Sequence, residues 1–111
     1  SSDAFEQLER IAARQDAPMI AALAVDAMRE LVGGTESASG AGKVAALEQV
    51  RDRCTDPVAA AQIKLALANT HWLELRDAAA ARALYGEIAN TSEPMVAQAA
   101  RDALAKLDAG Q

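Results

Sequence analysis

The sequence has very few aromatic residues: only Phe5, Trp72 and Tyr85, which make up 3% of its 111 residues. Apart from a few valines and isoleucines, the β-branched residues that favour strands are also scarce. Hydrophobic residues nevertheless make up 51% of the chain, and 29 of them are alanine, the residue with the highest helix propensity. This composition predicts a single all-α domain over residues 1–111, with a closely packed core of small side chains.

Cysteine and long apolar runs are nearly or entirely missing. Cys54 is the only cysteine, so the chain cannot form an internal disulfide and its redox compartment stays open. No apolar run reaches the ~18 residues that a transmembrane helix needs, and no basic start before an apolar stretch marks a signal peptide. We therefore expect no membrane insertion by this segment, whether it lies in the cytoplasm or is tethered in the periplasm. The first residue is serine rather than methionine, which favours a processed or shortened chain.

Side chains and motifs that carry chemistry are few. The net charge of −5 opposes attraction to phosphate backbones, so we expect no nucleic-acid partner. His71 is the only histidine and has no acidic residues around it at a metal-ligand spacing. The glycines before Lys43 lack the spacing and the Ser or Thr of a phosphate-binding loop. A nucleophile and base pair of Cys54 and His71 would lie on different helices, with no third orienting residue.

These observations predict no metal, no cofactor and no enzyme activity. Cys54 is then a small apolar filler at the end of a helix, and His71 faces solvent or lies at a rim. The charged run 51–53 is interpreted as a solvated face, with a docking contact as the alternative. Asp26, Arg29 and Glu30 are interpreted as another outer face that carries an i to i+3 ion pair.

Three prolines mark where helices begin. Pro57 follows Asp56 directly, and Pro18 and Pro94 follow Asp16 and Ser92 at a distance of two residues. Proline is tolerated in the first helical turn because its missing amide hydrogen would have no intrahelical partner there. A preceding Asp or Ser can accept hydrogen bonds from the other free amides. Each proline also disfavours helix in the residue before it, so the preceding helix must end.

The residues around the three prolines match when the prolines are aligned, which indicates a repeat of helix, turn and helix. A leucine lies ten residues before each proline and an alanine three residues after it. The positions six and ten residues after each proline are apolar as well, at the spacing of one helix face. The matched sets are Leu8, Leu47 and Leu84; Ala21, Ala60 and Ala97; Ala24, Ile63 and Ala100; and Met28, Leu67 and Leu104.

The resulting map contains six helices, over residues 4–15, 17–32, 43–54, 57–76, 78–91 and 94–108. The segment 33–42 is small, polar and glycine-rich, so we expect it to be one long flexible loop. It is interpreted as a linker, with a loop that closes over a ligand as the alternative.

The segment 65–94, LALANTHWLELRDAAAARALYGEIANTSEP, resembles a tetratricopeptide repeat, a helix-turn-helix unit defined by spaced large and small residues. The matching positions are Leu65, Ala68, Asn69 and Trp72 in the first helix, Leu75, Arg76 and Asp77 in the turn, Ala81 and Tyr85 in the second helix, and Pro94 at the joint. Arg76 stands where the family usually has glycine. The resemblance implies a short right-handed superhelix of three antiparallel helix hairpins, which binds a partner on its concave side.

Packing within this unit follows from residue size. We expect Trp72 to be largely buried, because it and Tyr85 are the large side chains available to fill the space between two helices. Ala81 and Gly86 would let the backbones of these helices approach each other.

The helix 57–76 is apolar on two sides, so it lies between two neighbours or faces a neighbour on one side and a partner on the other. One side carries Leu65, Ala68, Trp72 and Leu75. The nearly opposite side carries Ile63, Ala66, Thr70, Leu73 and Glu74. The resemblance places the ligand-facing positions of the repeat on this second side. We therefore predict that these five residues bind the partner.

The predicted function is a protein–protein interaction module that holds a peptide or a partner protein on the concave face. The predicted ligand is an extended or helical peptide with an apolar anchor, flanked by a basic residue that pairs with Glu74. The alternative is a structural or self-association segment of a larger helical-repeat protein. In that case the terminal hairpins stack on another copy of the chain, as a homo-oligomer, or on further parts of a longer protein.

Overall fold

The computed structural model describes residues 2–14 and 16–110, and within these ranges it contains helices, turns and no strand. The elements are α1 (Ser2–Ala12), α2 (Pro18–Gly33), the short 3-10 helix η1 (Gly34–Ser37), α3 (Gly40–Arg53), α4 (Pro57–Leu73), α5 (Ala78–Ala89) and α6 (Pro94–Asp108). The predictions of an all-α fold and of six α-helices are confirmed. None of these helices is long and apolar enough to cross a bilayer.

All three prolines begin a helix, as the sequence predicts. Pro18, Pro57 and Pro94 are the first residues of α2, α4 and α6. At α4 the Asp56 carboxylate accepts hydrogen bonds from two free amides of the first turn. The residues before α2 and α6 make no such side-chain cap, so only one of the three predicted caps forms.

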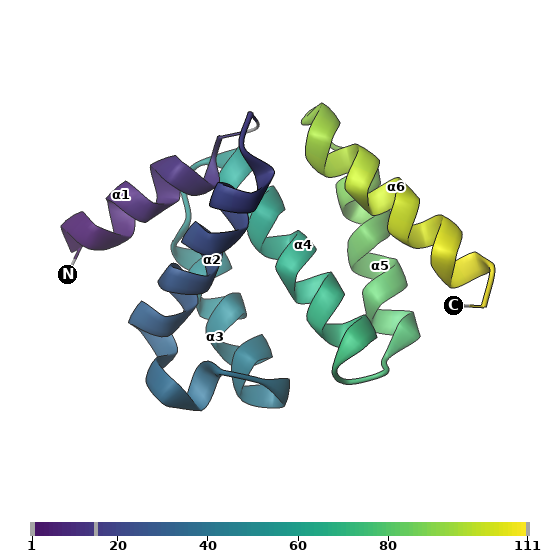
Figure 1. The fold of residues 1–111 in the computed structure, drawn as a ribbon, viewed down its shortest axis with the longest axis horizontal. Helices are drawn as coiled ribbons and strands as arrows, with labels where there is room; N and C mark the ends of the chain where they lie inside the picture. The colour runs from purple at the N-terminus through teal and green to yellow at the C-terminus, as the bar shows by residue number, and fades with distance from the viewer. Residues whose placement is uncertain (1, 15, 111) are drawn as a thin grey trace.

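Helix α4 is the centre of the molecule. It contacts each of the other five α-helices, while the remaining helices pack mainly against their neighbours in sequence. Figure 1 shows α1, α2 and α3 on one side of α4, and α5 and α6 on the other. The molecule is elongated, with extents of 42 × 29 × 21 Å.

Two hydrophobic clusters lie on either side of α4. The first joins α1 to α4 around Phe5, Met28, Leu47, Ile63 and Leu67. The second joins α4 to α6 around Ala68, Ala81, Tyr85, Val96 and Ala100. Helix α4 contributes apolar side chains to both clusters. Of the two arrangements predicted for this helix, the structure therefore shows the one in which it lies between two neighbours.

Aromatic packing in the second cluster differs in part from expectation. The rings of Trp72 and Tyr85 meet edge to face with centroids 6.2 Å apart. Tyr85 is fully buried, whereas Trp72 is only half-buried. Gly86 does not mark a close approach of two backbones, because a Cβ at this position would have no neighbour within 4 Å.

The predicted loop 33–42 is mostly helical. Gly33 ends α2, η1 occupies Gly34–Ser37, and α3 begins at Gly40, three residues before its predicted start. Buried Ser37 holds this connection, since the Arg29 guanidinium donates to its carbonyl oxygen at 2.6 Å and to its hydroxyl at 3.0 Å. Arg29 pairs with Asp26 at i to i+3, as predicted, but it is buried rather than part of an outer face.

Candidate functional site: a groove between α2 and α4

A groove of about 230 Å³ lies between α2 and α4, with one wall residue from α3. We call it the α2–α4 groove. It is lined by Ala22, Val25 and Asp26 of α2, by Lys43 of α3, by Gln62, Leu65, Ala66, Asn69, Thr70 and Leu73 of α4, and by Glu74, which caps α4.

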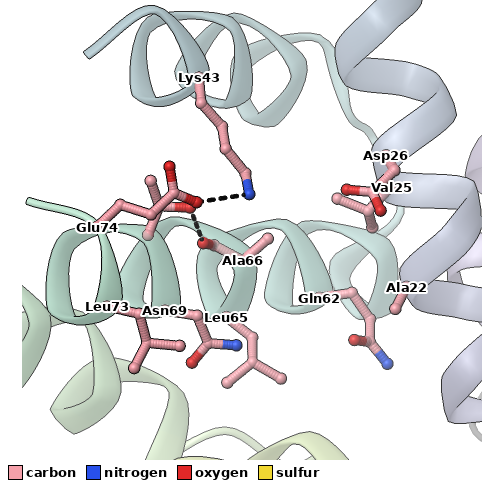
Figure 2. Close-up of a pocket in the computed structure, with 11 residues that line it drawn as sticks. Ala22, Val25, Asp26, Lys43, Gln62, Leu65, Ala66, Asn69, Leu73 and Glu74 are labelled. Atoms are coloured by element: carbon pink, nitrogen blue, oxygen red, sulfur yellow. Dashed lines mark hydrogen bonds and ion pairs between the residues drawn. The ribbon is translucent and has the colours of Figure 1, made fainter. Parts of the chain in front are cut away.

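Helical periodicity explains why these residues share one surface. On α4, the lining positions 62, 65, 66, 69 and 73 recur every three or four residues, which places them along one stripe. Positions 22, 25 and 26 do the same on α2. Figure 2 shows Leu65, Asn69 and Leu73 along one edge of α4, while Lys43 and Glu74 meet on the edge toward α3.

The five residues predicted to bind a partner fall into two groups. Ala66, Thr70, Leu73 and Glu74 line the groove, and the Leu73 side chain is 63% exposed. Ile63 is completely buried in the cluster shared with α1, α2 and α3, so its predicted exposure on a ligand-facing surface is wrong. Thr70 lies at the groove wall, but its hydroxyl donates to the Ala66 carbonyl at 2.8 Å and is already used.

Glu74 is held by α3. Its carboxylate accepts a hydrogen bond from the Gly40 amide at 2.9 Å and pairs with the Lys43 ammonium at 2.9 Å. These two donors hold the pKa of Glu74 below its ordinary value. Because both carboxylate oxygens already have partners, Glu74 joins α3 to α4 rather than offering a free acidic group.

Gln62 is a polar residue of the groove that the sequence analysis missed. It is 8% exposed, lines the groove and makes no side-chain hydrogen bond with any part of the chain that the structure describes. Its carboxamide atoms still reach the open groove, so they are available to hydrogen-bond with a ligand. The signal in the sequence was a polar side chain among the apolar residues of α4.

Asn69 lies two turns further along α4 and is oriented by α5. The Tyr85 hydroxyl donates a hydrogen bond to the Asn69 Oδ1 atom. The Nδ2 group of Asn69 therefore remains as a donor at the exposed end of the groove. The repeat resemblance included this position only as part of its pattern of large and small residues, which gave no indication of a polar contact.

Asp26 contributes the most accessible charge of the groove. Its side chain is 54% exposed, and its contact with the Arg29 Nε atom is long, at 3.8 Å. The Arg29 Nη1 atom makes its short hydrogen bonds with Ser37 instead. Asp26 is thus a weakly paired carboxylate on the α2 side of the groove.

The other chemically active side chains lie elsewhere. Cys54 is half-buried against the first cluster, where burial and the nearby charges of Glu9 and Asp56 raise its pKa to about 12. In the charged run 51–53, Arg51 forms an ion pair with Asp52. The Arg53 guanidinium stacks on the Phe5 ring. Among residues 2–14 and 16–110, no cluster of His, Cys, Asp and Glu could hold a metal ion.

Comparisons with protein families, with curated proteins and with solved structures find no match to this chain. Function is therefore inferred from the groove itself.

Proposed function

We propose that this protein is a binding module that holds a segment of another protein in the α2–α4 groove. The observation that carries this proposal is Gln62, whose carboxamide lines the groove and has no hydrogen-bond partner among residues 2–14 and 16–110. A bound segment would satisfy this group. The exposed Leu73 side chain at the end of the same groove would supply an apolar contact.

The proposal extends to the architecture. We propose that the six helices form a short right-handed superhelix of three tetratricopeptide-like hairpins, with the groove on its concave side. Two local features support it. The three prolines begin alternate helices, and Arg76 in the turn between α4 and α5 has a φ of 56°, the left-handed conformation that glycine adopts most easily. Glycine is the usual residue at this position of the repeat.

Leu73→Glu tests the binding proposal. A charge at this position should leave the fold intact because the side chain is 63% exposed, but it should repel an apolar anchor. Peptides would be selected from a random display library on the wild-type protein, and their affinity measured by fluorescence anisotropy. We expect Leu73→Glu to weaken binding at least about tenfold, a loss of about 1.4 kcal/mol.

Leu75→Glu is the matched control, because Leu75 is 39% exposed but lies outside the groove lining. It should bind the selected peptides like the wild type. Circular dichroism and melting temperature should be nearly unchanged in both variants. Equal affinity in Leu73→Glu and Leu75→Glu would place the binding surface elsewhere.

One feature favours the alternative, self-association. Four large apolar side chains of α2 are well exposed: Met19, Ile20, Leu23 and Leu31. We call them the α2 apolar stripe. Exposed apolar patches often mark contacts with another protein, and this one could pack against a second copy of the chain or another part of a longer protein.

A further inference from the structure

The charges along the α2–α4 groove are unbalanced. Two carboxylates, of Asp26 and Glu74, line it, against the single cation of Lys43. Arg29 and Glu30 are neighbours of Asp26 on α2 but do not line the groove. Lys43 pairs with Glu74 at 2.9 Å. Arg29 is shared between Asp26 and Glu30, each at 3.8 Å. One negative charge therefore remains uncompensated on the α2 side.

Asp26 is the carboxylate best placed to accept a cation from a ligand. It lines the groove itself, and its side chain remains 54% exposed. The apolar residues Val25, Leu65 and Ala66 lie in the same groove. A lysine or arginine side chain can pack its methylene groups on such a surface while its charged end reaches a carboxylate.

Gln62 indicates the backbone conformation of the ligand. A carboxamide offers one acceptor oxygen and two donor hydrogens, which match the N–H and C=O of a peptide group. Backbone N–H groups inside a helix already donate to the carbonyls of that helix, so a helical ligand cannot offer Gln62 both a donor and an acceptor. An extended segment leaves these groups free.

The spacing of Asn69 agrees with an extended ligand. Asn69 follows Gln62 by seven residues, which corresponds to roughly 10 Å along a helix. An extended chain covers roughly the same distance in three residues. Because Tyr85 holds the Asn69 oxygen, the free Nδ2 group can donate to a carbonyl further along the same segment.

From these observations we propose that the α2–α4 groove selects an extended segment in which a lysine or arginine lies beside aliphatic side chains. Asp26 pairs with the cation and Gln62 with the main chain. The inference rests on the proposed function and specifies its ligand class. The overall net charge of −5 acts in the same direction, because it attracts cationic segments and repels acidic ones.

The test uses three fluorescent octapeptide pools with random flanks and a fixed centre. The centre is leucine–lysine–leucine, leucine–norleucine–leucine or leucine–glutamate–leucine. Affinity is measured by anisotropy at low salt, and the side-chain amide resonances of Gln62 and Asn69 report contact with the groove. Norleucine keeps the aliphatic stem of lysine and removes only its charge.

We expect the lysine pool to bind about fivefold more tightly than the norleucine pool, the range of a partly exposed ion pair, and the glutamate pool to bind most weakly. Asp26→Asn should remove the preference for lysine. Asp52→Asn, which removes a carboxylate that is 71% exposed and lies outside the groove, should retain it. High salt should reduce the preference as well.

Gln62→Met tests the contact with the main chain. This change keeps the length of the side chain and removes its hydrogen-bonding groups, so binding of all three pools should weaken while the order of affinities is kept. Unchanged affinity in Gln62→Met would overturn the role of the carboxamide.

Two other outcomes are distinguishable. If the norleucine and lysine pools move the groove resonances equally, the proposed selectivity is wrong while the binding function stands. If no pool moves these resonances, both the selectivity and the proposed function are wrong.

Discussion

Buried polar side chains mark the connections between the helices. The Glu9 carboxylate of α1 accepts hydrogen bonds from the amides of Thr55 and Asp56 at 2.8 and 2.7 Å, so it ties α1 to the joint before α4. Arg29 holds Ser37 in the same way after α2. Each buried charge therefore has a structural partner. Gln62 differs from both, because it lines the groove and makes no side-chain hydrogen bond within the part of the chain that the structure describes.

Cys54 should be an unreactive thiol. Burial raises its pKa from 9.0 to about 12, so the thiolate that reacts with alkylating reagents is scarce at neutral pH. We expect iodoacetamide to modify the folded protein at pH 8 about 30- to 60-fold more slowly than a free thiol, after allowing for the greater nucleophilicity of a more basic thiolate. The rate should keep rising with pH well above 9.

The measurement is the alkylation rate by mass spectrometry from pH 7 to 11, with the chain unfolded in guanidinium as the control.

The raised pKa of Cys54 also affects stability. Above pH 9 the thiol ionises in the unfolded chain but not in the folded one, so the free energy of unfolding should fall as pH rises. If the alkylation rate of the folded protein levels off near pH 9, the Cys54 thiol has an ordinary pKa and both expectations are wrong.

At the scale of elements, two glycines in helices have opposite surroundings. A Cβ added to Gly42 in α3 would overlap the Glu36 carbonyl oxygen, whereas one added to Gly86 in α5 would meet nothing within 4 Å. The close approach at Gly42 lets η1 fold back on the first turn of α3. Gly86 has no such role, so only its low helix propensity matters.

We expect Gly42→Ala to destabilise the protein by about 1–3 kcal/mol, because η1 or α3 must shift to accommodate the methyl group. Gly86→Ala should instead stabilise it by about 0.5–1 kcal/mol, since alanine loses less backbone entropy in a helix. Urea denaturation followed by circular dichroism gives both values. Equal effects of the two substitutions would contradict the close contact at Gly42.

At the scale of the whole molecule, the exposed surface of α2 decides between binding and self-association. The α2 apolar stripe consists of four side chains, which is little compared with the ~800 Å² per partner of a stable interface. We therefore expect a monomer in light scattering at micromolar concentration. Any dimer should form only at high concentration.

Leu23 and Leu73 make a matched pair for this measurement, because each is 63% exposed. Leu23→Glu should abolish a high-concentration dimer that is built on the stripe, whereas Leu73→Glu should leave it unchanged. A dimer that persists on dilution and disappears in Leu23→Glu would favour self-association over the binding module.

The helices and their first residues were predictable from the sequence because they depend on local chemistry. Proline acts on its own turn and the residue before it, and alanine favours helix wherever it lies. The proline alignment places Ile63 at the same repeat position as Ala24 and Ala100, and all three side chains are buried in the structure. Assigning Ile63 to the binding surface contradicted that alignment.

The groove depends on contacts between residues that are far apart in the chain. Asp26 and Gln62 both line it, although 36 positions separate them in the sequence. A helical wheel orders the residues around α4 but does not show which neighbour covers each side. Only the packing of α1, α2 and α3 on one side of α4, and of α5 and α6 on the other, buried Ile63, joined Glu74 to Lys43 and placed Gln62 in the groove.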